Sequence, residues 1–91
     1  MYYIEASKET PLVSLNSEKG VFLIDGECVS ETPDEFFNNI TNWIENYSKN
    51  PYKTTTLTIN LRGINISSSK FLLNIIYQLE NESTDNYLYI V

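Results

Sequence analysis

The sequence predicts one α/β domain over residues 1–91, in which a mixed β-sheet carries two helices, mainly on one face. Two segments repeat apolar residues at the helical period, and the segments around them alternate apolar with polar residues or cluster β-forming ones. The elements should follow in the order β-β-β-α-β-α-β. Because a strand, a helix and a strand come last, we expect a right-handed parallel crossover there, with both helices on the same face of the sheet.

Three strands are expected before the first helix. YYIE (2–5) reads as a short strand that ends before the Thr10-Pro11 step, because proline lacks an N–H and pushes its predecessor towards extended geometry. LVSL (12–15) and VFLIDGECV (21–29) should pair as a hairpin. The turn between them ends at Gly20, which can take the positive φ that such a turn needs.

The first helix is predicted to begin after Thr32 and to end at Lys49-Asn50-Pro51. Pro33 suits the first helical position, and Thr32 with Glu35 has the spacing of a capping box. An apolar stripe along this segment favours a helix packed on a sheet over a groove for a ligand. The stripe consists of Phe36, Phe37, Ile40, Trp43, Ile44 and Tyr47.

The second half of the chain supplies the crossover. Residues 54–61 alternate leucine and isoleucine with threonine and asparagine, which predicts a strand with one strongly apolar face. A second apolar helical stripe follows over 68–81. We expect a polar connection at 81–86 and a final strand at 87–91.

The charge of the chain argues against several classes of partner. A formal net charge of −6 repels phosphate groups, so neither nucleic acid nor an anionic membrane is an expected partner. No apolar run approaches the roughly 20 residues that span a bilayer, and no secretory leader is expected. The expectation is therefore a soluble, cytoplasmic protein.

The residue types present also limit the chemistry. The absence of histidine excludes Ser-His and Cys-His catalysis and histidine-ligated zinc. Cys28 is the one cysteine and, without a base to activate it, is expected to be a buried or idle thiol. The glycine fingerprints of nucleotide sites are missing. We expect no enzymatic activity, cofactor or metal, with a small enzyme using Asp or Glu chemistry as the alternative.

The segment GINISSSK (63–70) is the most informative part of the chain. It follows a strand and opens a helix, where unpaired N–H groups and the helix dipole favour an anion. Ser67 or Ser68 is expected to cap this helix through its hydroxyl. A regulatory phosphate, which would add about −1.5 to −2 charges, is the alternative use of the same hydroxyls, and the residues alone leave both open.

Several motifs, in order, resemble the SiaC family of bacterial regulatory phosphoproteins. They are the Thr10-Pro11 step, the hairpin turn that contains Gly20, SETPDEFFNNITNWIENY (30–47) and LRGINISSSKFLLNII (61–76). The resemblance covers nearly all of the chain. It implies a STAS-like fold, similar to that of anti-sigma-factor antagonists.

The resemblance also implies a non-enzymatic switch with protein partners. Members of the family are phosphorylated by a kinase and dephosphorylated by a PP2C-type phosphatase. In the unmodified form they bind and activate a diguanylate cyclase, whose product, cyclic-di-GMP, favours aggregation or biofilm formation. The alternatives are a STAS-type anti-sigma-factor antagonist and a truncated copy with a structural or oligomeric role.

The family's functional positions carry over residue by residue. Its phosphoacceptor threonine falls on Ile66, which has no hydroxyl, so either Ser67 or Ser68 is the acceptor or the protein stays unmodified. The expected partner-binding loop comprises Gly63, Asn65, Ile66, Ser67, Ser68, Ser69 and Lys70. A secondary contact is expected at Glu31, Asp34 and Glu35.

The chain ends at the strand beyond which family members continue. If the family's continuation covers part of the sheet, a chain without it exposes apolar surface that a partner or a second copy must cover. A homodimer is therefore a further expectation.

Overall fold

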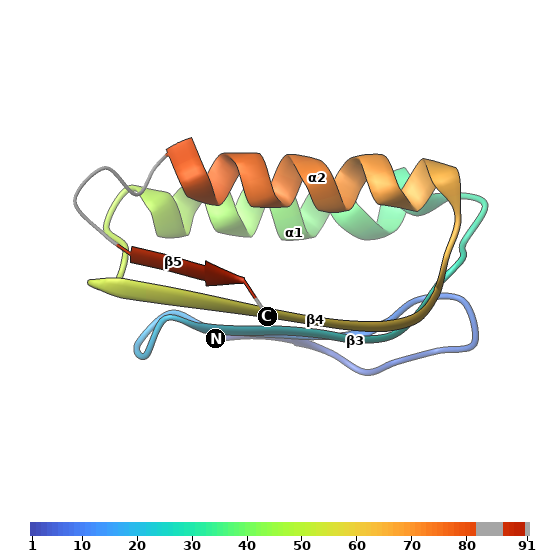
Figure 1. The fold of residues 1–91 in the computed structure, drawn as a ribbon, viewed down its shortest axis with the longest axis horizontal. Helices are drawn as coiled ribbons and strands as arrows, with labels where there is room; N and C mark the ends of the chain where they lie inside the picture. The colour runs from blue at the N-terminus through green and yellow to red at the C-terminus, as the bar shows by residue number, and fades with distance from the viewer. Residues whose placement is uncertain (82–86, 91) are drawn as a thin grey trace.

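The computed structural model describes residues 1–81 and 87–90, and within them five strands form one sheet against two helices. Both helices lie on the same face of the sheet (Figure 1). The elements are β1 (Tyr2–Ile4), β2 (Leu12–Asn16), β3 (Val21–Cys28), α1 (Pro33–Ser48), β4 (Thr54–Ile64), α2 (Ile66–Asn81) and β5 (Tyr87–Ile90). The predicted mixed α/β fold with two helices on one face is therefore confirmed. Asn81, the first residue of the predicted connection at 81–86, is the last residue of α2. The rest of that connection lies outside the described residues, as does the last residue of the predicted strand at 87–91.

The strands stand in the sheet in their order along the chain. β1, β2 and β3 pair antiparallel, as a short strand followed by the predicted hairpin. β3, β4 and β5 pair parallel, and α1 and α2 make the two crossovers between them. The predicted parallel arrangement at the end of the chain is confirmed.

The core lies between the sheet and the two helices. Each helix buries one stripe, while β2 and β3 turn every second side chain towards the helices, as the period of a strand requires. The buried apolar residues are Val13, Leu15, Phe22, Ile24, Cys28, Phe37, Ile40, Ile44, Tyr47, Leu57, Leu72, Ile75 and Leu79. The aromatic stripe of α1 is thus part of a core rather than a ligand groove, as predicted.

Tyr47 connects the end of α1 to the start of β4 through ring contacts and hydrogen bonds. Its ring stacks on Trp43 with centroids 5.6 Å apart and meets Phe22 edge-on at 4.9 Å. Its hydroxyl lies 2.7 Å from the buried hydroxyl of Thr55 and accepts the N–H of Tyr52 at 3.1 Å. These bonds satisfy the buried hydroxyl of Tyr47, which would lower the stability of the fold if it had no partner.

The predicted capping box at the start of α1 is wrong. Pro33 is the first helical residue, as expected, but the side chain of Thr32 makes no capping hydrogen bond. Instead the Thr32 N–H donates to the Ser30 hydroxyl at 3.1 Å, and the two hydroxyls lie 3.4 Å apart. Ser30, two residues upstream, thus bonds both the N–H and the hydroxyl of Thr32. The spacing of Thr32 and Glu35 alone does not reveal this competing partner.

Gly20 closes the β2–β3 hairpin with a φ of +64°, the positive value that the turn was predicted to need. A Cβ at this position would collide with the backbone carbonyl of Thr54. The close approach of Gly20 to the start of β4 allows a backbone hydrogen bond, in which the Thr56 N–H donates to the Gly20 carbonyl at 2.7 Å. The absence of a side chain at Gly20 therefore lets β4 begin alongside the hairpin.

We predict that Gly20→Ala lowers the free energy of unfolding by more than about 2 kcal/mol, because alanine adds both a left-handed backbone penalty and a clash with backbone. Urea unfolding followed by circular dichroism measures the change. Lys19→Ala, an exposed position in the same turn, is the control and should stay within about 0.5 kcal/mol of the parent. Equal stabilities of the two variants would contradict the role given to Gly20.

Candidate functional site

The residues expected to form the partner-binding loop, Gly63–Lys70, are not a loop, and we call them the β4–α2 corner. β4 continues to Ile64, which still pairs with Cys28 of β3, and α2 begins at Ile66. Asn65 alone joins the two elements. The expected loop is therefore corrected to a strand end and a first helical turn, because backbone pairing on one side and a helix cap on the other leave no free segment.

Asn65 holds the corner together through both its side chain and its backbone. Its Oδ1 accepts the N–H of Ser68 at 2.8 Å, and its Nδ2 donates to the carbonyl of Ser30 at 2.8 Å. Its own N–H donates to the Cys28 carbonyl at 3.1 Å. One residue thus ties the start of α2 to the end of β3 and to the segment that leads into α1.

The expected cap at Ser67 or Ser68 is therefore wrong, and the cap is Asn65. Asparagine and serine are about equally good N-caps, so the residue types did not decide between them. The position decides: α2 begins at Ile66, and the residue before it must accept an N–H from the first turn. The spacing of Asn65 and Ser68, cap to third helical residue, is the signal that was available and missed.

The three serines of the corner differ sharply in exposure. Ser67 is exposed, Ser68 is 0% exposed, and Ser69 is half-buried with its hydroxyl donating to the Ile66 carbonyl at 2.6 Å. Ile66, at the position that the resemblance assigns to the family's acceptor, is 80% exposed. Of the two expected phosphate acceptors, Ser67 is open to an enzyme, whereas Ser68 is enclosed in the fold.

Ser68 lies beside the buried thiol of Cys28. Its Oγ has no hydrogen-bond partner of ordinary geometry among the described residues. Burial raises the pKa of the Cys28 thiol, and the neighbouring Ser68 hydroxyl offsets part of that rise in pKa. The thiol is therefore protonated at neutral pH, and the prediction that Cys28 is buried is confirmed.

The acidic residues expected as a secondary contact share one end of the molecule with the corner. Glu31, Asp34 and Glu35 are all exposed, and the latter two stand in the first turn of α1. Both helices start at the same end of the sheet (Figure 1). The bond from Asn65 to the Ser30 carbonyl draws the segment before α1 against the corner. The structure thus brings the two expected contacts to one end of the sheet.

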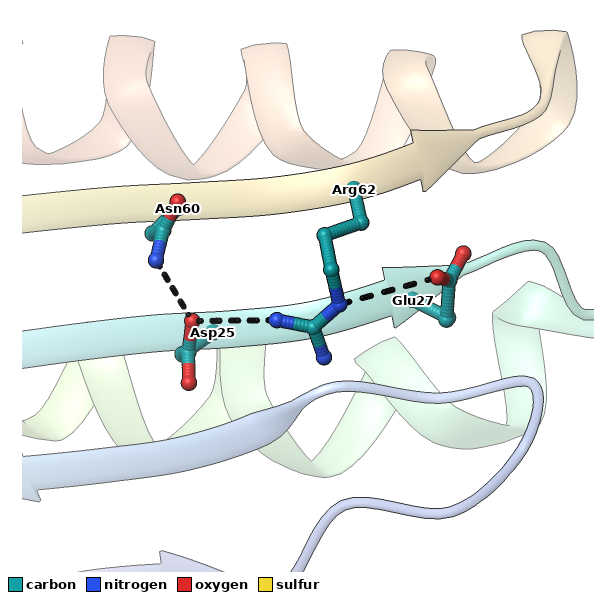
Figure 2. A network of polar contacts seen from close by, with 4 residues as sticks. All are labelled: Asp25, Glu27, Asn60 and Arg62. Carbon is teal, nitrogen blue, oxygen red and sulfur yellow. Dashed lines mark hydrogen bonds and ion pairs between the residues drawn. The ribbon is translucent and has the colours of Figure 1, made fainter.

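A second polar cluster, which the sequence analysis missed, lies on the other face of the sheet (Figure 2). Asn60 Nδ2 donates to Asp25 Oδ1 at 2.9 Å, and Arg62 reaches Asp25 at 4.0 Å and Glu27 at 3.7 Å. Arg62 occupies a β-bulge, because Gly26 pairs with Leu61 and Glu27 with Gly63. Alternation along the strands could have placed these side chains on one face. Asp25-Gly26 is also a turn or bulge candidate from its residue types, and the register does shift directly after Gly26, but the residue types do not show that Arg62 extends along β3.

The Arg62 cluster is better explained as support for the bulge than as a site. The Arg62 side chain is 62% exposed, and exposed ion pairs of this length contribute at most about 1 kcal/mol. Groups of three or more potential metal ligands are absent from residues 1–81 and 87–90. In the same part of the chain, neither helix is long and apolar enough to cross a bilayer.

Comparison with known proteins identifies the fold and the family. Residues 4–90 match the model of the SiaC family regulatory phosphoprotein. Apo-SiaC from Pseudomonas aeruginosa superposes with a TM-score of 0.90 at 21% identity, over 98% of this chain and 74% of that one. SiaC of the same organism in complex with the diguanylate cyclase SiaD superposes with a TM-score of 0.89 at 21% identity, over 99% and 75%. A search of curated proteins finds no match.

We predict that Asn65→Ala lowers the free energy of unfolding by about 2 to 3 kcal/mol, because it removes the cap and the bond to the Ser30 carbonyl. Asn65→Asp keeps an acceptor for the Ser68 N–H but loses the donor, so its loss should be about half as large. Denaturant unfolding measures both changes.

Ser67→Ala is the matched control for these variants. Its exposed hydroxyl makes none of the bonds described above, so its stability should stay within about 0.5 kcal/mol of the parent. If Ser67→Ala proved as destabilising as Asn65→Ala, the assignment of the cap to Asn65 would be wrong.

Proposed function

Because the chain belongs to the SiaC family of regulatory phosphoproteins, we propose that it works by binding a diguanylate cyclase and raising the activity of that enzyme. The family is one of regulatory proteins and not of enzymes, in agreement with the expectation from the sequence. The observation that carries the proposal is the family match over residues 4–90, together with the fold shared with a SiaC that forms a complex with a diguanylate cyclase.

The β4–α2 corner is the proposed contact with the cyclase, with Glu31, Asp34 and Glu35 as a second contact. The corner offers an exposed Ile66 beside an exposed serine, and the hydrogen bonds of Asn65 hold its backbone in one arrangement. A surface that is ordered before binding loses little conformational entropy when a partner docks. The corner is thus suited to recognition by a protein.

Ser67 is the proposed phosphate acceptor and the basis of an off-switch. It is the second residue of α2, where a phosphate would be favoured by the free N–H groups and the helix dipole. Lys70 follows three residues later and is exposed. A phosphate would bring about −1.5 to −2 charges to a surface that a partner must meet, so it would change recognition without unfolding the helix.

The proposed pathway therefore includes a kinase and a PP2C-type phosphatase that act on Ser67. Because ATP and GTP are the substrates of the kinase and the cyclase, the protein would work in the cytoplasm. A STAS-like classification of the fold is part of the same proposal, and family membership favours a cyclase over an anti-sigma factor as the partner.

We predict that the partner kinase places a single phosphate on Ser67. The protein is incubated with the kinase and ATP, and phosphopeptides are mapped by mass spectrometry. Ser67→Ala should abolish the phosphate, whereas Ser17→Ala, in the hairpin turn, should leave it unchanged. Phosphate on any other residue, or none with a kinase that is active on its own substrates, would contradict the off-switch.

We also predict that the unmodified protein accelerates cyclic-di-GMP formation by its cyclase, and that Ser67→Asp weakens the apparent affinity by about tenfold through the added negative charge. Formation of cyclic-di-GMP at increasing concentrations of the protein gives this affinity. Ser67→Asn is the control, because it has nearly the same size without the charge. Equal affinities of the Asp and Asn variants would remove charge as the basis of the switch.

A further inference from the structure

β4 is paired further along one of its sides than along the other. Its pairing with β3 extends as far as Ile64, whereas its pairing with β5 extends only as far as Leu57. β4 continues well past the end of β5 (Figure 1). In the part of the chain that the structure describes, no strand pairs with the β5 side of residues 58–64. We call this side of residues 58–64 the open β4 edge.

The burial of side chains changes where β5 stops. Leu57, which pairs with Ile90 of β5, is 0% exposed. The next helix-facing residues of β4, Ile59 and Leu61, are only partly buried. Ile24, which pairs with Ile59 on the β3 side, is 1% exposed, so the loss of burial belongs to the open β4 edge and not to the end of the sheet. The core is therefore incompletely covered along this edge.

The backbone of the open β4 edge indicates what kind of group would cover it. The Thr56 N–H donates to the Gly20 carbonyl, on the β3 side of the strand. Successive residues of a strand direct their N–H and C=O groups to opposite sides, so those of Leu61, five residues later, are directed away from β3. Backbone groups of this kind are satisfied by another strand or by water. An extended peptide is therefore the partner that fits this edge.

We propose that the open β4 edge binds an acidic, extended segment of another protein, which joins the sheet as a further strand. The segment pairs with residues 58–64 in line with β5 and places every second residue, which is apolar, against Ile59 and Leu61. Its remaining residues lie beside Thr58 and Asn60, on the face of the sheet that the helices do not cover. This inference does not depend on the proposed diguanylate cyclase.

Charge defines the segment as acidic. From Thr54 to Leu79, which covers β4 and nearly all of α2, the only charged residues are Arg62 and Lys70, both positive, in a chain whose net charge is −6. The other edge strand of the sheet, β1, is followed directly by Glu5. Opposite charges on neighbouring strands stabilise their pairing and like charges destabilise it. An acidic segment therefore prefers the open β4 edge to the edge at β1.

A second copy of the chain fits this edge less well than an acidic segment does. If it paired through its own open β4 edge, it would bring Arg62 and no carboxylate. The Arg62 side chain is 62% exposed, and its ion pairs with β3 measure 3.7 and 4.0 Å, which is longer than a hydrogen bond. The guanidinium thus retains donors for a carboxylate on an added strand, and a second copy does not supply one.

The test uses the 91-residue chain and a short synthetic peptide in which valine alternates with glutamate or threonine. Hydrogen exchange followed by NMR reports the protection of single backbone amides. The acidic peptide should slow exchange of the Leu61 amide by about tenfold or more, and leave the amides of β1 within about twofold of their rates without peptide. A matched peptide with lysine in place of glutamate should bind about tenfold more weakly.

A pair of variants tests the same edge. Leu61→Glu places a carboxylate on the open β4 edge and should weaken binding of the acidic peptide by about tenfold or more. Ile4→Glu is the matched control, because Ile4 is a half-buried apolar residue of the other edge strand, and its effect should be less than about twofold. Circular dichroism checks that both variants fold. The exchange of the Leu61 amide in the parent protein decides the question if either variant does not.

Three results overturn the inference. If the acidic peptide leaves the Leu61 amide unprotected up to its solubility limit, or protects β1 instead, the open β4 edge does not bind a strand. If the lysine peptide binds as tightly as the acidic one, the occupant is not an acidic segment. If the Leu61 amide is already protected without peptide and the protein sediments as a dimer, the occupant is a second copy.

Discussion

The hydrogen bonds of Asn65 are the constraint on which the candidate functional end of this protein depends. Its side-chain oxygen caps α2, its amide holds the carbonyl of Ser30, and its backbone N–H closes the pairing of β4 with β3. Helix, sheet and the approach to α1 are therefore fixed relative to one another at a single residue. The placement of Ser67 in the first turn of α2 follows from that junction together with the packing of Leu72, Ile75 and Leu79 in the core.

Because this junction keeps the start of α2 ordered, it favours a switch that changes surface charge over one that changes folding. Many regulated segments change between ordered and disordered states when they are phosphorylated. Here the proposed acceptor stands on a helix that is capped by Asn65 and packed through Ile75 and Leu79, and a phosphate in the first turn favours the helical state. The proposed modification would therefore change the charge of a fixed surface and would leave the helix folded.

Most of the fold could be predicted from the sequence because its signals are local or periodic. The helical stripes of α1 and α2, the alternation in β4 and the glycine in the hairpin turn each depend on a few neighbouring residues. The details of the candidate site depend on competition between similar groups. Asn65 displaces the serines as a cap, Ser30 takes the N–H of Thr32, and the bulge turns Arg62 along β3. The first two outcomes are choices between neighbouring polar groups of similar capping strength, and the third depends on the pairing of β4 with β3, which spacing along the chain does not encode.

The unequal burial of three consecutive serines has a consequence for how the proposed switch would respond to a kinase. Ser68 is enclosed beside Cys28 and the Ser69 hydroxyl is held by the Ile66 carbonyl, so the run SSS presents one hydroxyl and not three. Proteins modified at several sites can respond in a threshold-like manner, because activity changes after the last site is filled. Under the proposed function, a single presented hydroxyl would give each molecule two states, and the active fraction would follow the balance of the proposed kinase and phosphatase in a graded way. The packing of one serine would thus shape the dose response of the proposed signal.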